Sequence, residues 1–543
     1  MKEMLMKEMK KSNQTTTTNG AKAFKSSLDA NVDLFGLGGS SRRMSDSDFT
    51  SLVSKALSED LELGLMNILY LSDIREGSGE RFFLKRALKV LRNEYPNVLL
   101  KLIKEIPELT RWDYLYFILE QDLLVKYKDQ TPQYENRQGR ATYSNFPKRQ
   151  KGLIKDGYTF TMSKFSKEAL EIIKKEYNKE IGENCTSLMY KWLKSINTSS
   201  ILSKTLGSIT RNYLGVTPKQ YRKKLKKARK FLDVVERKMS KNKWNKIEYS
   251  KVPSKATVRY SKAFERHDLE RYQEFLEKVN TGEEKINTSV TYPHDVIHQY
   301  ALNSGGINSF FGRSTHTDAT LETVWNNLPN FLEGTNENIL PIIDTSGSMW
   351  QRVSDESQLQ VIEVAVGMGI YFAERMGGEY KNHWINFSTY PSFQKLEGNT
   401  LRAKVSNLDY SNWEQSTNID KVFKLILDTA VKNNVKQENL PTKLLIISDM
   451  QFNGHVRISN YKEAKKAFKE KGYEIPQVIF WQMNAYTPQT PVKYGEHGTA
   501  LISGYSPNIC KIIANGTITT PLETMHKTIY IEKYINIVKE ILK

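Results

Sequence analysis

The sequence predicts an α-helical module followed by a doubly wound α/β domain with a parallel sheet, and two observations lead to this fold class. From about Ser47 to Lys285, apolar residues recur at the spacing of helices, and no strand-rich section interrupts them. From about Glu337, short apolar strands alternate with helices, a pattern typical of a parallel sheet covered on both faces. The run of helices favours a HEAT-like repeat module, with an irregular helical bundle as the alternative.

The same patterns divide the chain into four segments. Residues 1–20 are polar and are expected to form a disordered tail. Residues 21–290 form the helical module, residues 291–336 form a connector, and residues 337–543 form the α/β domain. Within the helical module, residues 128–160 are rich in Lys, Arg and Tyr, which indicates either a basic, aromatic insertion or a solvated, disordered loop.

Composition narrows the class of partner. The 543 residues include 80 Lys and Arg against 61 Asp and Glu, a formal net charge of +19. This excess favours an acidic partner such as nucleic acid, unless the charge only aids solubility. Two cysteines, Cys185 and Cys510, are too few for a disulfide framework. The N-terminus lacks the apolar core of a signal peptide, and the most apolar run, Val361–Ala373, is too short to span a bilayer. The sequence therefore predicts a cytoplasmic protein with no membrane partner.

The densest positive charge lies between Lys219 and Lys246, where 13 basic residues are opposed only by Asp233 and Glu236. The apolar residues of this stretch keep helical spacing, so one face is expected to pack and the others to be charged. Such cations would bind phosphates with a salt-dependent, sequence-tolerant affinity, whereas a merely solvated helix face is the alternative. The candidate nucleic-acid-binding residues are Lys219, Arg222, Lys223, Lys224, Lys226, Lys227, Arg229 and Lys230.

The α/β domain carries oxygen-bearing side chains at three predicted strand or helix ends. The strand over Asn338–Asp344 ends in the motif Asp-Thr-Ser-Gly-Ser, and the strand over Lys443–Asp449 ends on a carboxylate. Thr417 precedes a helix over Asn418–Lys432. Because the carboxyl ends of parallel strands share one edge of a sheet, these side chains are expected to converge, and their hard oxygens suit Mg²⁺. The remaining predicted elements are a helix over Glu356–Met376 and strands over His383–Phe387, Gln477–Gln482 and Thr499–Ser503.

These motifs resemble the metal-ion-dependent adhesion site of the von Willebrand factor A domain. In that family, an Asp and two Ser of the first loop, a Thr of the second and an Asp of the third hold Mg²⁺ or Mn²⁺. This chain has Met450 directly after the third-loop Asp, where many family members have Gly. The resemblance implies a von Willebrand factor A-like domain over residues 337–543 with Asp344, Ser346, Ser348, Thr417 and Asp449 as metal ligands.

A helical module followed by such a domain resembles the TROVE-module proteins, the Ro autoantigen group, over about residues 20–540. The match is more specific to a family of phage, giant-virus and plant proteins with the same layout. For Ro proteins it implies a ring of helical repeats closed by the metal-site domain, with single-stranded RNA ends in a basic hole and small structured RNAs outside. The stretches that carry the resemblance are Ser72–Arg81, Arg111–Asp113, Leu188–Leu193, Pro218–Arg222 and Tyr249–Ser254.

The combined prediction is an RNA-binding, Ro-like ribonucleoprotein component. The basic helical segment would contact RNA, and the metal site would bind a carboxylate of a protein partner or close the ring. The alternative is a metal-dependent protein-interaction scaffold without RNA. Enzymatic activity is not expected, because two Asp are too few carboxylates for a two-metal nuclease and no phosphate-binding glycine loop is present. If the chain is viral, the expected location is the host cytoplasm.

Overall fold

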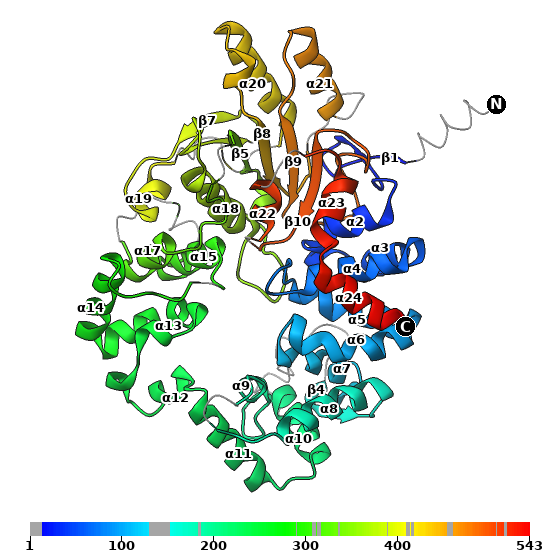
Figure 1. Ribbon diagram of the computed structural model, residues 1–543, viewed down its shortest axis with the longest axis vertical. Coiled ribbons are helices and arrows are strands. Elements are labelled where there is room, and N and C mark those ends of the chain that lie inside the picture. The colour runs from blue at the N-terminus through cyan, green and yellow to red at the C-terminus, as the bar shows by residue number, and fades with distance from the viewer. Residues whose placement is uncertain are drawn as a thin grey trace, which may run out of the picture. The chain divides into compact units, whose positions relative to one another are not determined.

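The computed structural model (Figure 1) divides the chain into two compact units. The first, here called the sheet unit, contains Met1–Ala87 and Lys238–Lys539, and the second, the helical unit, contains Leu88–Arg237 and Glu540–Lys543. The structure describes residues 13–129, 153–182, 186–288, 290–306, 311, 317–334, 337–387, 389–408, 413, 417–452, 460–506, 508–514 and 518–543.

The sheet unit is built on six strands in the order β10-β9-β8-β5-β6-β7. The first five pair in parallel, and β7 pairs antiparallel with β6 at the edge. The predicted parallel sheet is therefore confirmed, whereas the polar strand β7 was not predicted. The strands are β5 (Ile339–Asp344), β6 (His383–Phe387), β7 (Ser392–Lys395), β8 (Lys443–Ser448), β9 (Gln477–Gln482) and β10 (Thr499–Ser503).

Helices flank this sheet, and every residue of the central strands β5 and β8 is therefore buried. Helix α18 (Val361–Arg375) packs directly on β5, where Gly369 permits the approach. A Cβ at this position would lie 1.9 Å from Ile343 Cδ1. Each buried Ile or Leu of such a strand contributes about 1.5–3 kcal/mol by leaving water. The other helices after β5 are α19 (Leu401–Ser406), α20 (Ile419–Lys432), α21 (Asn460–Glu470), α22 (Ile509–Ala514), α23 (Pro521–Ile529) and α24 (Glu532–Leu542), the last of which runs past the unit boundary.

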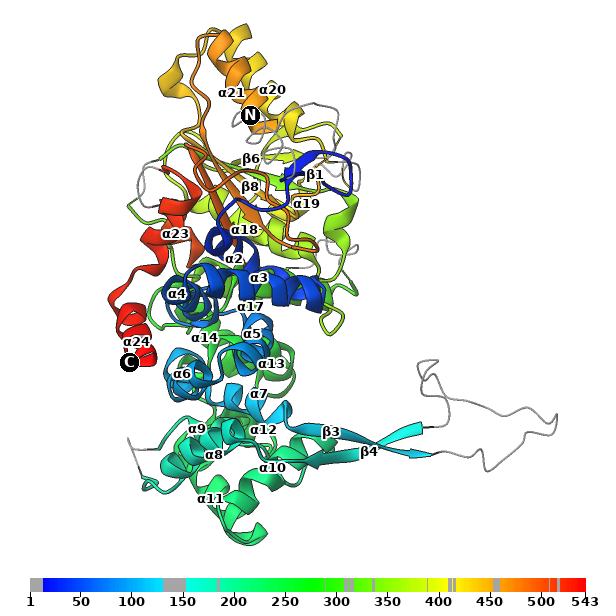
Figure 2. The ribbon, with the colours of Figure 1, turned by 90° about the vertical axis from the view of Figure 1, so that its right-hand side faces the viewer.

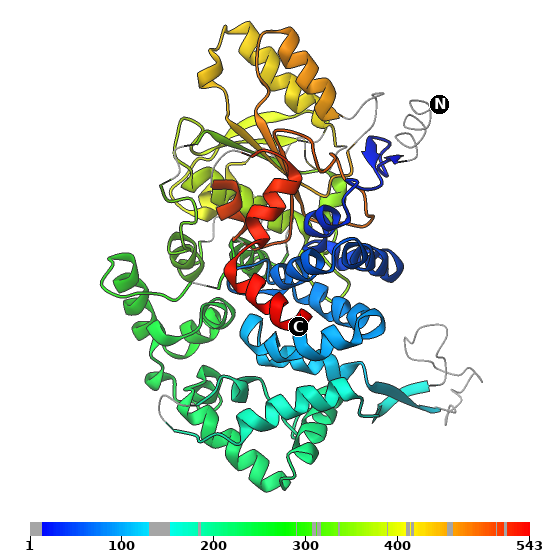
Figure 3. The same ribbon diagram turned by 45° about the vertical axis from the view of Figure 1, so that its right-hand side comes forward.

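The N-terminal residues belong to the sheet unit, although they lie far from the sheet in sequence. Helix α2 (Ala30–Gly38) packs on β10, and Gly39 N donates to Ser503 Oγ at 2.9 Å. Figure 3 shows these N-terminal helices beside the C-terminal helix α23. The disordered tail expected over residues 1–20 does not extend to residues 13–20, because β1 (Gln14–Thr16) pairs with β2 (Lys22–Phe24). The other helices here are α3 (Asp46–Glu59), α4 (Leu61–Ser72) and α5 (Arg81–Glu94), which crosses into the helical unit.

The described residues between 238 and 334 also include four α-helices that belong to the sheet unit. Helix α15 packs on α18 at Gly367, where a Cβ would lie 3.3 Å from His294 Cα. Burial keeps the His294 imidazole neutral by lowering its pKa to about 4. The helices are α13 (Ser254–His267), α14 (Leu269–Asn280), α15 (Pro293–Asn303) and α17 (Ala319–Asn326).

The helical unit contains a β-hairpin as well as helices. The hairpin pairs β3 (Leu123–Asp129) with β4 (Leu153–Phe160) and contacts α10, as Figure 2 shows. The expectation of uninterrupted helices over this region is therefore wrong here, and most of the predicted basic insertion, residues 130–152, lies outside the described residues. The helices are α6 (Pro96–Leu109), α7 (Leu115–Glu120), α8 (Lys164–Tyr177), α9 (Met189–Trp192), α10 (Ile201–Tyr213) and α11 (Pro218–Phe231), followed by α12 (Val235–Met239) at the boundary. Within the described residues, no helix has the length and apolar character that a membrane crossing requires.

Candidate metal centre and basic helix

The candidate metal residues lie at the switch point of the sheet. Chain order runs from β5 outward to β6 on one side and then returns to β8 on the other. Because β5 and β8 are parallel neighbours, with Ile343 opposite Ile447, Asp344 and Asp449 emerge at the same carboxyl edge. Ligands of doubly wound sheets bind at such an edge, where the strand order reverses.

The first loop holds three of the predicted ligands in one turn. Ser346 N donates to Asp344 Oδ1 at 2.9 Å, which folds the loop back over the carboxylate. A short 3₁₀ helix over Gly347–Trp350 then places Ser348 Oγ 3.3 Å from Ser346 Oγ. Two hydroxyl oxygens and one carboxylate therefore lie close together within this loop.

The third loop is joined to the first by hydrogen bonds. Ser448 Oγ donates to Asp344 Oδ2, so the last residue of β8 holds the first-loop carboxylate. Gln451 N donates to Asp449 Oδ1 at 3.1 Å. Met450, which lies between Asp449 and Gln451, adopts φ +59°, a left-handed conformation that glycine adopts without strain. The position where many von Willebrand factor A domains have Gly is thus the one that requires a positive φ.

Residues 17–21 support the third loop from outside. Thr17 Oγ1 donates to Phe452 O, and Asn19 Nδ2 donates to Gln451 O at 2.7 Å. The Thr18 amide completes this set by donating to Gln451 Oε1 at 3.0 Å. The N-terminal segment therefore fixes the backbone that follows Asp449.

The electrostatics of this edge are set by two buried carboxylates. Asp344 and Asp449 are both fully buried. Burial and, to a lesser extent, the nearby Asp449 raise the pKa of Asp344 to about 7, against the lowering effect of hydrogen bonds from Ser346 and Ser448. Burial also raises the pKa of Asp449, against a lowering hydrogen bond from Ser348. Two buried carboxylates at one edge repel each other unless one is protonated or a cation lies between them.

Unsatisfied polar atoms test whether a metal fits this arrangement. Asp449 Oδ2 and Thr417 Oγ1 are buried and have no hydrogen-bond partner among the described residues. Thr417 lies just before α20, and among the described residues no hydrogen bond joins it to the other four candidates. In the described part of the chain, no three His, Cys, Asp or Glu side chains gather as a metal-binding group. A cation here would thus depend on hydroxyl oxygens beside the two carboxylates, a donor set that fits Mg²⁺ or Mn²⁺.

The predicted basic residues lie on helix α11 of the helical unit. The helix begins with a capping box, in which Thr217 Oγ1 accepts from Gln220 N at 3.3 Å and Gln220 Oε1 accepts from Thr217 N at 2.8 Å. Tyr221, Leu225 and Ala228 form its buried face. At 3.6 residues per turn, six cations lie within an arc of about 140° on the opposite face. These exposed residues, here called the basic stripe, are Lys219, Arg222, Lys223, Lys226, Lys227 and Lys230.

The other two predicted cations pack inward at the flanks of the basic stripe. Arg229 donates from Nε to Tyr190 O at 2.9 Å and from Nη2 to Leu193 O at 2.8 Å. Lys224 Nζ donates to Tyr177 O and lies 4.3 Å from the centre of that ring. Burial lowers the pKa of both groups. Lys224 and Arg229 therefore have a structural role that the sequence did not reveal.

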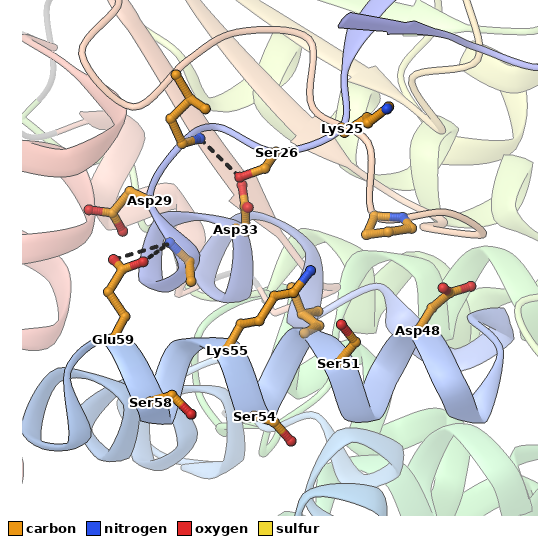
Figure 4. A pocket seen from close by; sticks show the side chains of 14 residues that line it. Lys25, Ser26, Asp29, Asp33, Asp48, Ser51, Ser54, Lys55, Ser58 and Glu59 are labelled. Atoms are coloured by element: carbon orange, nitrogen blue, oxygen red, sulfur yellow. Dashed lines mark hydrogen bonds between the residues drawn. The ribbon is translucent and has the colours of Figure 1, made fainter. Parts of the chain in front are cut away.

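A separate pocket of about 560 Å³ lies between α2 and α3 (Figure 4). Several of its carboxylates are used by the fold itself. Asp29 accepts from Val32 N at 2.8 Å, Asp33 accepts from Ser27 N at 2.7 Å, and Glu59 accepts from Ala30 N at 3.1 Å. These groups cap the start of α2, so the pocket gives no indication of a ligand.

The fold and the two sites define a helical protein with a doubly wound α/β domain. Residues 338–536 match a family described as "Domain of unknown function (DUF7788)", and residues 184–334 match "Domain of unknown function (DUF2828)". A relative from Acanthamoeba polyphaga mimivirus, "Uncharacterized protein L728", is 27% identical over 538 residues, which covers 94% of this chain and 86% of that protein.

Two solved structures show weaker likeness. The Deinococcus radiodurans Ro (RSR) protein is 12% identical with a TM-score of 0.33, covering 90% of this chain and 93% of that one. An aerotolerance-related membrane protein from Bacteroides fragilis is 15% identical with a TM-score of 0.19, covering 38% and 96%. Scores this low carry no argument about function, so the function is argued from the sites alone.

Proposed function

We propose that this chain is an RNA-binding protein whose basic stripe contacts the RNA backbone and whose α/β domain holds Mg²⁺ or Mn²⁺. The basic stripe supports the RNA part. Among the described residues, none of its six side chains forms an ion pair or a hydrogen bond. Cations held on one rigid face without acidic neighbours keep their full charge for a polyanion.

The dimensions of the basic stripe suit a nucleic-acid backbone. Lys219 and Lys230 are eleven residues apart, so the cations extend over about 16 Å along the helix. Each phosphate that a cation neutralises releases a bound counterion, and single strands lose about 0.7 in the slope of log K against log salt per contact. Six contacts would therefore give a slope of about −4. Because these are backbone contacts, the affinity would depend little on base sequence.

The metal part rests on the buried carboxylates and the unsatisfied oxygens at the sheet edge. Asp344 and Asp449 would balance the charge of the ion, while Ser346, Ser348 and Thr417 would offer neutral oxygens. Bound there, the ion would supply a hard positive charge for a carboxylate of a protein partner. Closure of a ring of helical repeats is the other use of the site that the TROVE-like layout suggests.

The alternative function, a metal-dependent interaction scaffold without RNA, is supported by the two cations of α11 that pack inward. Lys224 and Arg229 show that part of the positive charge stabilises the fold. If the basic stripe only aids solubility, removal of its charge will not change the affinity of the protein for any specific ligand.

The test compares two quadruple variants with equal loss of charge. The first changes Lys223, Lys226, Lys227 and Lys230 of the basic stripe to Ala. The control changes four exposed lysines of the sheet unit to Ala, namely Lys465, Lys466, Lys469 and Lys471.

Fluorescence anisotropy with a labelled 20-nucleotide single-stranded RNA would be measured over a range of salt concentrations. We expect the slope of log K against log salt to become shallower by about 3 in the stripe variant, from about −4 to about −1. The control is expected to bind like the wild type. Equal loss in both variants would mean that net charge alone attracts RNA. No binding by the wild type would favour the scaffold without RNA.

A further inference from the structure

A fourth strand end lies beside the candidate metal centre. Strand β9 is the parallel neighbour of β8, and Gln482 pairs with Ser448, the residue before Asp449. Met483 N donates to Ser448 O at 2.9 Å, which continues the pairing past the end of the strands. The residues after Gln482 therefore run along the same edge as the third loop.

The orientation of the Gln482 amide is fixed by its hydrogen bonds. Its Nε2 donates to Asp449 O and to Asn484 O, both at 3.3 Å. Only the nitrogen can donate to two carbonyl oxygens, so the assignment of oxygen and nitrogen is determined. This leaves Gln482 Oε1 buried and without a partner in the described part of the chain.

Asn484 is fully buried, and neither atom of its amide has a partner among the described residues. The phenol of Tyr486 lies nearby, but it donates its single proton to Gln351 Oε1. Tyr486 can therefore only accept from the Asn484 amide nitrogen. Burial is the main cause that raises the pKa of the Tyr486 phenol, and the charge of Asp449 adds to it, so Tyr486 lies near Asp449.

The unsatisfied oxygens at this edge share one property. Asp449 Oδ2 as a carboxylate, Gln482 Oε1 and Asn484 Oδ1 can only accept hydrogen bonds. Among the described residues no donor reaches these three oxygens, and a bound molecule that donates hydrogen bonds would satisfy them. Mg²⁺ keeps several of its waters when it binds to proteins, and water on a cation is a strong donor.

We propose that Gln482 and Asn484 form an outer shell of the metal centre, in which Gln482 Oε1 and Asn484 Oδ1 accept hydrogen bonds from waters bound to the ion. This inference rests on the proposed metal site and adds two residues that the five-ligand motif does not contain. Both act as positioning residues, because they would touch the ion's waters and not the ion. Such outer-shell partners typically change metal affinity by about 10–100-fold.

The shell also predicts a preference among ions. Mg²⁺ and Mn²⁺ hold their waters in a nearly octahedral arrangement that fixed acceptors can match, whereas Ca²⁺ takes more ligands at longer distances. Loss of the shell is therefore expected to weaken Mg²⁺ more than Ca²⁺.

Isothermal titration calorimetry of Mg²⁺ and of Ca²⁺ into the metal-free full chain tests this inference. Asn484→Leu keeps the branching at Cγ and removes the amide, so we expect Mg²⁺ affinity to fall at least about 10-fold, with a smaller change for Ca²⁺. Asn484→Asp keeps the acceptor oxygens and is expected to bind Mg²⁺ at least as tightly as the wild type. Thr490→Val is the control, because Thr490 Oγ1 is also buried and unpartnered but no bond joins it to the metal edge. It is expected to leave Mg²⁺ affinity unchanged.

The outcomes separate this inference from the metal site itself. If the wild type binds no Mg²⁺, the metal centre and its outer shell both fail. If the wild type binds Mg²⁺ and Asn484→Leu binds it equally well, the metal centre stands and the outer shell is wrong. Should Asn484→Leu not fold, as judged by circular dichroism, Asn484→Ser removes the amide with a smaller change in packing, and the same weakening is expected of it.

Discussion

The sheet edge and the basic stripe place charge in opposite ways. At the sheet edge, two carboxylates are fully buried and come from β5 and β8, more than 100 residues apart in sequence. On α11, six cations come from twelve consecutive residues and are all exposed. Buried charge is costly unless it is compensated, whereas exposed charge on one helix costs little. The difference teaches that the sheet edge needs a compensating proton or cation, whereas the basic stripe carries charge that needs no partner within the fold.

The largest expected effect separates the two sites. Asp344→Ala removes one carboxylate and the acceptor that holds Ser346 N and Ser448 Oγ. We expect calorimetry to detect no Mg²⁺ binding by this variant, while its affinity for single-stranded RNA stays within about twofold of the wild type. Loss of RNA binding in a folded Asp344→Ala protein would show that the two sites are not independent.

The second prediction concerns pH and the metal-free protein. The folded pKa of Asp344 is raised to about 7, while the unfolded value is about 3.9. Between these two pH values the folded state keeps a proton that the unfolded state has lost. The raised pKa therefore contributes stability to the folded state that is fully present below about pH 4 and is lost as pH rises through 7. The shift corresponds to about 4 kcal/mol.

Thermal unfolding of the wild type and Asp344→Asn in EDTA, from pH 5 to pH 8, measures this term. We expect the variant to gain stability relative to the wild type as pH rises, and saturating Mg²⁺ to remove the wild-type loss. A constant difference between the two proteins over this range would mean that the pKa of Asp344 is not raised in the folded protein.

The third prediction compares an inward and an outward cation of α11. Arg229→Met removes the charged donors to Tyr190 O and Leu193 O, which should cost about 2–3 kcal/mol of unfolding free energy. Lys226→Ala, an exposed change in the basic stripe, should cost less than about 0.5 kcal/mol. Urea denaturation gives both values. Equal destabilisation would show that the two classes of cation are not distinct.

The smallest expected effect concerns the N-terminal support of the third loop. Thr17→Val keeps the side-chain shape and removes the hydrogen bond to Phe452 O, at a cost of about 1 kcal/mol. Because Gln451 and Phe452 follow Asp449, we also expect a two- to threefold loss of Mg²⁺ affinity. Ser58→Ala, at an exposed position of α3 and far from the third loop in sequence, serves as a comparison and should leave Mg²⁺ affinity unchanged. Unchanged affinity in Thr17→Val would limit the role of the N-terminal segment to stability.

The sheet could be predicted because its strands are buried on both faces. Five of the strands, β5, β6, β8, β9 and β10, begin and end within one residue of the prediction, since continuous apolar runs mark such strands. Strand β7 has no such run, because its side chains alternate between half-buried and exposed at the sheet edge. The hairpin strand β3 had a usable signal, the alternation of Val125 and Tyr127 with Lys126 and Lys128, which helical periodicity obscured.

The candidate metal centre was predictable only in part. Asp344, Ser346, Ser348 and Asp449 lie at strand ends. Hydrogen bonds join the first three, and Ser448, the residue directly before Asp449, donates to Asp344. The contacts of residues 17–19 with the third loop span more than 400 residues and leave no local pattern. Gln482 and Asn484 did carry a signal, because polar residues end an apolar strand there as Asp344 ends β5.

The proposed metal site requires that one divalent ion bind between the first, second and third loops. Anomalous X-ray scattering from crystals of the full chain grown in Mn²⁺ tests this directly. We predict a single strong peak within about 2.3 Å of oxygen atoms of Ser346 and Ser348, with Asp344, Thr417 and Asp449 bound directly or through one water. A peak located elsewhere, or no peak at millimolar Mn²⁺, would contradict the metal site.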